Sequence, residues 1–244
     1  MSRTAVYSAL VLKNRISGET NSEISLLTAE EGIIKVTVFG GPKSKLRSHA
    51  APYNSGQVWI YRDKAKSYGK LSDFDVHSWR AGLRELYERT MAAGAIADTI
   101  LSTHGGGGDW GKALKLAVST LDALEDANEE LCAYLLVHFL WRWAGFLGLQ
   151  PNVDICVSCG KEIDGYLLFN AGEDSVLCAD CAPEQSGLLQ INSGCRRWLT
   201  AVERLEPSLL HRYSMDKISF REAKSLSAAV LAGALGKHLS SWEW

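Results

Sequence analysis

The first third of the chain alternates apolar and polar positions in short runs. The runs occupy residues 4–12, 22–28, 32–39, 57–61 and 67–71. Each run is rich in aliphatic or β-branched side chains, and turn residues such as Gly18, Gly32 and Pro42 separate them, so they predict five short strands. Five strands in about seventy residues favour a small closed barrel, and the five-stranded OB-fold is the most economical choice.

From about residue 76 the apolar residues follow a helical period. Residues 78–93 and 114–124 each carry an apolar face, and a glycine-rich stretch separates the two predicted helices. Asn128 is a candidate N-cap of an apolar core helix, which Pro151 would end. Two further helices are expected at residues 192–205 and from residue 219, where Ser219 to Glu222 matches a capping box.

Two Cys-x-x-Cys pairs interrupt this helical pattern. Cys156 and Cys159 form the first pair, Cys178 and Cys181 the second, and eighteen residues lie between them. A two-residue gap lets both thiolates of a pair face one ion, and two pairs complete the tetrahedral sulfur shell that zinc prefers. Residues 166–170 predict a strand and residues 171–174 a turn, so the spacing indicates a zinc-ribbon-like hairpin with one structural zinc per chain.

These patterns predict an α+β protein with two domains. Residues 1–76 form the OB-fold barrel, and residues 77–244 form a helical domain with a zinc-ribbon-like insertion at 152–183. Disulfides or a redox-active pair are alternatives for the cysteines, but disulfides need an oxidising compartment that no other feature of the chain supports. Cys132 and Cys195 lie in apolar helical contexts and predict buried free thiols.

No membrane segment or secretory leader is expected. The longest apolar run, residues 131–149, contains His138 and Arg142, which favours a buried helix over a membrane span. The first apolar stretch is short and has no basic leader. We therefore expect a soluble, intracellular protein.

The net charge of −2 hides an asymmetry. Residues 1–72 hold eleven Lys and Arg against five Asp and Glu, whereas residues 73–244 hold fifteen against twenty-three. A basic first third favours a module that binds a polyanion, with ordinary surface charge as the alternative.

The basic residues gather in turns and loops of the predicted barrel. Residues 40–54 form an expected flexible loop in which lysines and an arginine alternate, and a tyrosine that can stack on a base follows. Such a surface follows a phosphate backbone without reading bases. The candidate nucleic-acid-binding residues are Lys13, Arg15, Lys43, Lys45, Arg47, Tyr53, Arg62 and Lys64.

Signatures of catalysis are absent from the sequence. Residues 106–113 match the phosphate-binding loop pattern except at its end, where Ala113 has no hydroxyl for magnesium, so the glycines predict a mobile connection instead. No histidine has a glutamate two residues later, which argues against a zinc deaminase. Four thiolates leave the metal no open position for water. We expect a protein that is not an enzyme.

Several stretches resemble the bacterial recombination mediator family RecO. They are residues 9–13, 18–20, 25–32 and 40–45 in the barrel, and the two cysteine pairs with Gly160, Phe169 and Gly172 between them. The order of barrel, helices, zinc hairpin and helices also matches over most of the chain. At the start of the basic loop the sequence departs from the family, because Phe39 replaces the usual basic residue and Pro42 interrupts the loop.

The resemblance implies a non-catalytic mediator of DNA repair and homologous recombination in the RecF pathway. Such a protein binds single- and double-stranded DNA, anneals complementary strands, and works with RecR to load RecA onto DNA coated by single-strand-binding protein. The resemblance also implies a groove for the acidic C-terminal tail of that protein, and a cytoplasmic location at the nucleoid. An RNA-binding or translation factor with a barrel and a zinc ribbon stays open, as does a zinc-dependent redox or hydrolytic enzyme.

Overall fold

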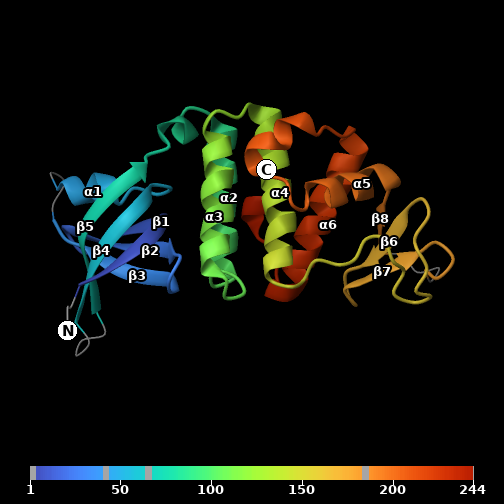
Figure 1. The fold of residues 1–244 in the computed structure, drawn as a ribbon, viewed down its shortest axis with the longest axis horizontal. Coiled ribbons are helices and arrows are strands. Elements are labelled where there is room, and N and C mark those ends of the chain that lie inside the picture. The colour runs from blue at the N-terminus through green and yellow to red at the C-terminus, as the bar shows by residue number, and fades with distance from the viewer. Residues whose placement is uncertain (1–3, 41–43, 64–67, 183–186, 244) are drawn as a thin grey trace. The chain divides into compact units, whose positions relative to one another are not determined.

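The structure is a computed structural model that describes residues 4–40, 44–63, 68–182 and 187–243 (Figure 1). The chain divides into two compact units, Met1–Asp126 and Ala127–Trp244, called here the N-terminal and C-terminal units. The domain boundary that the sequence predicts at residue 76 stays a prediction. No helix within the described ranges is both long enough and apolar enough to cross a bilayer.

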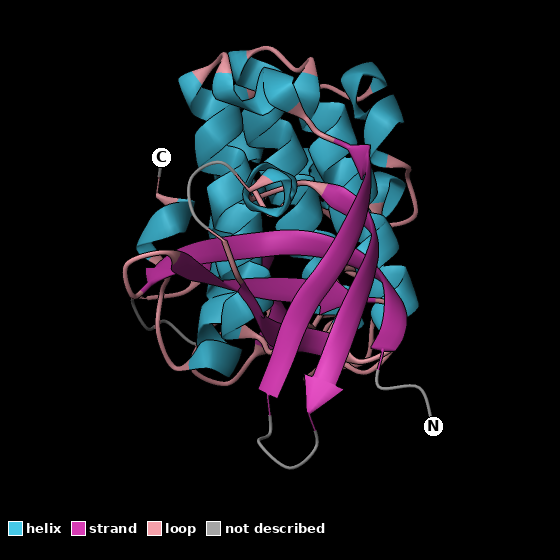
Figure 2. Ribbon diagram, turned by 90° about the vertical axis from the view of Figure 1, so that its left-hand side faces the viewer, coloured by secondary structure: helices cyan, strands magenta, loops and turns pink. Residues whose placement is uncertain are grey.

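The N-terminal unit is built on a closed five-stranded barrel, as the sequence predicts. The strands are β1 (Thr4–Ser17), β2 (Asn21–Thr28), β3 (Gly32–Val38), β4 (Ser55–Asp63) and β5 (Tyr68–Ser78). Their order around the barrel is β1-β2-β3-β5-β4, and β1 closes it by pairing with β4. Figure 2 shows these strands curving around one another. The order and the closure confirm the OB-fold expected from the sequence.

Alternation along the strands gives the barrel two apolar faces. Val11, Ile24 and Ile60 point inward and are fully buried in the barrel core. Leu10 and Leu27 are register partners with the opposite parity, yet both are also fully buried. They are covered because helices α2 (Tyr87–Ser102) and α3 (Trp110–Glu125) pack on the outside of β1 and β2. The N-terminal unit therefore has a second core between barrel and helices.

Two expectations about this unit were wrong. The basic stretch is not wholly a loop, because residues 45–49 form the short helix α1 (Lys45–His49), whose end is held by a hydrogen bond from the Asn14 side chain to the Ala50 carbonyl oxygen (2.9 Å). The helix predicted from residue 78 begins later. β5 continues to Ser78, and a 3-10 turn, η1 (Ala81–Arg84), precedes α2.

The glycine-rich connection between α2 and α3 packs on the barrel. His104, Gly105, Gly106 and Gly108 all have positive φ angles, which glycine adopts without strain. Gly105 is buried, and a Cβ atom there would lie 3.1 Å from the Ile33 side chain. Gly105 therefore allows close packing against β2 and β3, and the mobility of the connection stays a prediction.

The C-terminal unit combines three long helices with a small sheet. The helices are α4 (Glu129–Phe146), α5 (Ser193–Val202) and α6 (Lys217–Leu235), with the 3-10 turns η2 (Pro207–Arg212) and η3 (Ser240–Trp242). The sheet has the order β7-β6-β8, from β6 (Leu167–Asn170), β7 (Ser175–Cys178) and β8 (Leu189–Ile191). Asn128 caps α4 as predicted and Asn192 caps α5, each accepting a backbone N–H three residues later.

The start of α6 differs from the sequence prediction. Asp216, rather than Ser219, is the N-cap, and its carboxylate accepts the N–H groups of Ile218 and Ser219. Ser219 lies inside the first turn and donates its hydroxyl to Asp216 (2.6 Å) and Asn192 (3.0 Å). The serine therefore links the caps of α5 and α6, a tertiary contact that the local capping pattern does not contain.

His138 lies fully buried in α4 and is expected to make stability depend on pH. Burial, reinforced by the charge of Arg142, lowers its pKa to about 4, although its Nε2 lies 3.2 Å from the Val202 carbonyl oxygen. In the unfolded chain the His138 imidazole binds a proton near pH 6.5, whereas in the folded chain it stays neutral down to about pH 4. The free energy of unfolding therefore falls as the pH drops from 6.5 to 4. The loss is on the order of 2–3 kcal/mol.

Urea unfolding of the parent and of His138→Gln at several pH values measures this effect. The glutamine amide can still donate to Val202 but does not titrate, so the stability difference between the two proteins should change by that amount over this range. His211 is exposed, and His211→Gln should leave the profile unchanged. Parallel curves for the parent and His138→Gln would contradict the prediction.

Candidate metal centre and nucleic-acid interface

The first cysteine pair lies in a tight turn. The Cys156 N–H donates to the Lys161 carbonyl (3.0 Å), and the Gly160 N–H donates to the Cys156 carbonyl (2.9 Å). Gly160 has a φ of +70°, which explains the glycine directly after the pair. The Val157 N–H donates to the Val176 carbonyl in β7 (2.9 Å), so the turn is attached to the sheet.

The second pair begins at the end of β7. Strands β6 and β7 form the predicted hairpin, and the turn between them is held by Asn170, whose side chain accepts the Gly172 N–H (3.0 Å). Cys178 is the last residue of β7, and its carbonyl accepts the N–H groups of Cys181 (3.2 Å) and Ala182 (3.1 Å). β8, which the sequence pattern did not reveal, pairs with β6 on its other edge.

The four cysteines converge on one point, as their spacing predicts. Their Sγ atoms all lie within 4.8 Å of one another, and those of Cys159 and Cys178 are 4.0 Å apart. Four sulfurs at about 2.3 Å from a tetrahedral zinc would be about 3.8 Å apart. The donor set and its spacing therefore fit one metal ion in a closed, structural type of site. Cys132 and Cys195 are buried elsewhere as free thiols.

Arg196 attaches the hairpin to α5, a role that sequence reasoning missed. Its guanidinium donates to the carbonyl oxygens of Ile163 (2.7 Å) and Gly165 (2.9 Å), and it forms an ion pair with Asp154 (3.2 Å). Only 14% of the Arg196 side chain is exposed. One arginine thus satisfies backbone groups of the connection between the first cysteine pair and β6.

A basic groove of about 370 Å³ crosses the outside of the barrel in the N-terminal unit. Lys13 in β1 is the register partner of Ser25 in β2, and Ser25 is the partner of Lys35 in β3. Register partners project from the same face of a sheet, so these side chains form one row across three strands. Arg15 lies two residues beyond Lys13 and lines the same groove.

The other wall of the groove belongs to α2. Asp98, Leu101 and Ser102 share one helical face there, and His104 follows at the end of the helix. Glu23, the register partner of Arg15, also lines the groove. The groove therefore has cations along the barrel and carboxylates at Glu23 and Asp98. Lys35 and His104 were absent from the sequence-based candidates, because only the folded barrel places them beside Lys13.

The remaining sequence candidates are arranged differently. Lys45 is exposed on α1, Arg47 is half-buried there, and the bond between Asn14 and Ala50 places the end of this helix beside β1. Lys43 and Lys64 lie outside the described residues. Arg62 forms an ion pair with Glu31, and its guanidinium lies 5.4 Å from the centre of the Tyr7 ring.

Tyr53 is half-buried and faces α2. A Cβ atom added at Gly94 would lie 3.8 Å from the Tyr53 hydroxyl oxygen. Burial, together with the nearby charge of Asp98, raises the pKa of the Tyr53 hydroxyl. Its backbone has a φ of 74° and receives a hydrogen bond from Arg80 at its carbonyl. This geometry gives Tyr53 a packing role between barrel and helix rather than an open stacking surface.

Curated relatives match this chain over most of its length. A protein of Desulforamulus reducens is 24% identical over 97% of this chain and 91% of its own length. A protein from Anaeromyxobacter dehalogenans strain 2CP-1 is 28% identical over 97% of this chain and 94% of its own length. A protein from Bacillus subtilis is 25% identical over 89% of this chain and 84% of its own length. All three are named DNA repair protein RecO.

Two family models account for nearly all of the chain. The model for the N terminus of recombination protein O matches residues 1–79, and the model for its C terminus matches residues 84–243. The first covers the barrel, and the second covers the helices and the four-cysteine hairpin. The chain therefore belongs to the recombination protein O family, RecO.

Proposed function

We propose that this protein is a non-catalytic DNA repair and recombination mediator that binds single- and double-stranded DNA through its barrel. The groove with Lys13, Arg15 and Lys35 is the observation that carries this proposal. Three cations on a fixed sheet can follow a phosphate backbone, and each contact releases condensed counterions. The names of the relatives support a role in DNA repair. The role places the protein in the cytoplasm, at the nucleoid.

The two walls of the groove differ in charge. Phosphates are favoured along the row of Lys13 and Lys35 and disfavoured near Asp98 on α2, whereas Glu23 lies on the barrel as the register partner of Arg15 and offsets its charge. We infer that a bound strand runs with its backbone on the barrel side, while α1, with Lys45 and Arg47, extends the basic surface along β1. Annealing needs only that two polyanions be neutralised and held together, so no nucleotide hydrolysis is required.

The remaining parts of the proposal follow the family. The protein would work with RecR to load RecA onto DNA coated by single-strand-binding protein, whose acidic C-terminal tail would bind the helical part of the chain. Zinc at Cys156, Cys159, Cys178 and Cys181 would hold the hairpin together, because a closed four-thiolate site supplies folding energy rather than a reactive water.

Binding to single-stranded DNA over a range of salt concentrations tests the proposal. We expect binding to two unrelated sequences with similar affinity, weakening as salt rises. Lys13→Ala/Lys35→Ala should reduce the slope of log K against log salt by about 1.4, since each phosphate contact on a single strand contributes about 0.7. If both proteins bind equally at 1 M salt, this corresponds to roughly 25-fold weaker binding at 0.1 M. Lys45→Ala/Arg47→Ala tests the contribution of α1 in the same assay.

A matched variant controls for net charge. Lys161→Ala/Lys237→Ala removes two exposed lysines of the C-terminal unit and should bind DNA as the parent does. Equal losses in both double variants would show that the groove is not the binding surface. Competition with RNA of the same sequence separates the alternative function, because strong preference for RNA would indicate an RNA-binding factor instead.

A further inference from the structure

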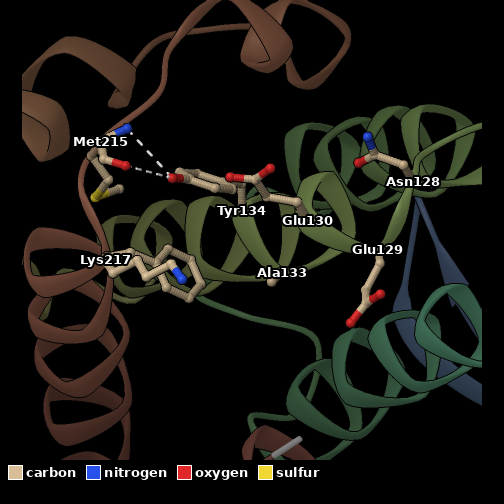
Figure 3. A pocket seen from close by; sticks show the side chains of 8 residues that line it. Asn128, Glu129, Glu130, Ala133, Tyr134, Met215 and Lys217 are labelled. Atoms are coloured by element: carbon tan, nitrogen blue, oxygen red, sulfur yellow. Dashed lines mark hydrogen bonds between the residues drawn. The ribbon is translucent and has the colours of Figure 1, made fainter.

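A cleft of about 580 Å³ lies at the start of α4 in the C-terminal unit (Figure 3). One wall is the first two turns of α4, with Glu129, Glu130 and Ala133. The other wall is the beginning of α6, with Lys217 and Phe220. Tyr134 lies between the two walls in Figure 3.

The floor of this cleft is aromatic and fixed. Tyr134 is 8% exposed, and its hydroxyl donates to the Met215 carbonyl oxygen (3.0 Å), a bond drawn in Figure 3. Its ring lies 4.9 Å from the Phe220 ring and 6.2 Å from the Trp198 ring. With both ends of the tyrosine held, the floor offers apolar surface that needs no rearrangement to receive a side chain.

The rim of the cleft is acidic. Glu129 and Glu130 are exposed, and neither has an ion-pair partner among the described residues. Carboxylates in a first helical turn also stabilise the helix, but that role does not neutralise them. The C-terminal unit as a whole holds ten Lys and Arg against fourteen Asp and Glu, a balance of −4. Lys217 lies exposed on the opposite wall, so the lining carries two carboxylates and one ammonium group. A cationic partner is therefore favoured on the α4 side of the cleft and at longer range.

The cleft continues beyond Tyr134. A neighbouring hollow of about 180 Å³ shares Asn128, Glu130 and Tyr134 with it and is also lined by Tyr213, which is 39% exposed. An elongated cleft with an aromatic floor and an acidic edge matches an extended chain segment better than a compact small molecule.

We propose that this cleft docks a basic, apolar peptide segment of a partner protein. An aliphatic or aromatic side chain would lie on Tyr134 and Phe220 beside Ala133, and a lysine or arginine of the peptide would pair with Glu129 and Glu130. An acidic tail suits this cleft less well, because the two carboxylates would repel it and Lys217 alone would attract it. The site uses no residue of the basic groove, so the inference stands independently of DNA binding.

Fluorescence anisotropy with two labelled peptides tests this inference on the full chain without DNA. Both peptides carry the same central leucine and phenylalanine, flanked by arginines in one and by glutamates in the other. The arginine peptide should bind saturably and the glutamate peptide should not. Glu129→Lys/Glu130→Lys should weaken the arginine peptide about ten-fold or more and let the glutamate peptide bind. Ala133→Leu, which fills the floor, should weaken binding about ten-fold as well.

Glu162→Lys/Glu173→Lys is the control, since it makes the same charge change at exposed positions of the hairpin in the same unit. If this control weakens the arginine peptide as much as the rim variant does, binding is non-specific and the proposal fails. It also fails if the parent prefers the glutamate peptide, or if Ala133→Leu keeps its fold by circular dichroism and binds as before. Circular dichroism of the rim variant must match that of the parent for a gain of glutamate-peptide binding to support the proposal.

Discussion

Removal of the zinc proposed for the four-cysteine cluster, by a chelator or by Cys178→Ser, is expected to unfold the hairpin that carries β6, β7 and β8 while the barrel stays folded. Structural zinc contributes on the order of 10 kcal/mol to small zinc domains, which exceeds what so short a sheet can supply by itself. Cys178 ends β7 and also accepts the hydrogen bonds that form the second cysteine turn. Cys178→Ser removes a ligand from the cluster, while the backbone carbonyl that accepts these bonds remains, so the loss isolates the effect of the metal.

Hydrogen exchange resolved by segment is the measurement for this effect. Amides of residues 167–178 should lose their protection, and the start of α5 should weaken because β8 leads directly into its cap, Asn192. The barrel strands should exchange as in the parent. Metal analysis should give one zinc per chain for the parent and none for the variant.

Cys132→Ser provides the thiol control. Cys132 is buried outside the cluster, and its Sγ lies 3.9 Å from the Ala127 carbonyl oxygen, a contact that a serine hydroxyl can keep. This variant should retain zinc and the protection of the hairpin. A Cys178→Ser protein that has lost zinc but keeps both its thermal stability and the protection of β6 and β7 would show that the fold does not need the metal.

Asp122→Ala is expected to destabilise the N-terminal unit by about 2–3 kcal/mol, less than for a fully buried pair because the Asp122 side chain is 50% exposed. The Arg80 side chain is completely buried, and its Nε donates to Asp122 Oδ1 (2.8 Å). The same guanidinium donates to the Tyr53 carbonyl and to Ser55 Oγ in the barrel. Removing the aspartate leaves a buried cation without its counter-charge, which costs more than the pair contributes to stability.

Thermal and urea unfolding of the parent, Asp122→Ala and Asp122→Asn measure this effect. The asparagine keeps an acceptor for Nε but not the charge, so its loss should be smaller. Asp126→Ala is a control, because Asp126 is exposed and ends the same unit. A change below about 1 kcal/mol in Asp122→Ala, as for an ordinary surface ion pair, would mean that water reaches Arg80 and replaces the aspartate.

The cysteine cluster and the barrel were predictable because both depend on short-range rules. Two Cys-x-x-Cys pairs can close around one ion wherever the chain between them makes a hairpin, and the sequence predicts the turn of that hairpin at residues 171–174. Strand alternation likewise marks the inward residues of the barrel. Strand ends were less predictable. β5 continues to Ser78 because it pairs with β4, and the sequence after residue 71 has no pattern that predicts this pairing.

The parts that could not be predicted depend on contacts between distant residues. The groove joins Lys13, Lys35 and His104 only after β1, β3 and α2 are assembled. Arg80 and Arg196 look like ordinary surface charges in the sequence, yet both are buried by partners forty or so residues away. Ser219 looks like a cap in its local pattern, and Asp216 takes that position because it lies at the true start of α6.

The burial of Leu10 and Leu27 beneath α2 and α3 also bears on how this architecture is inherited. The boundary between the two family descriptions falls at residues 79–84, where the chain passes from strand to helix inside one packed interior. A barrel separated there would present both leucines to water. A protein that acquired this barrel by recombination would therefore need helices α2 and α3 as well, or polar side chains in place of the two leucines.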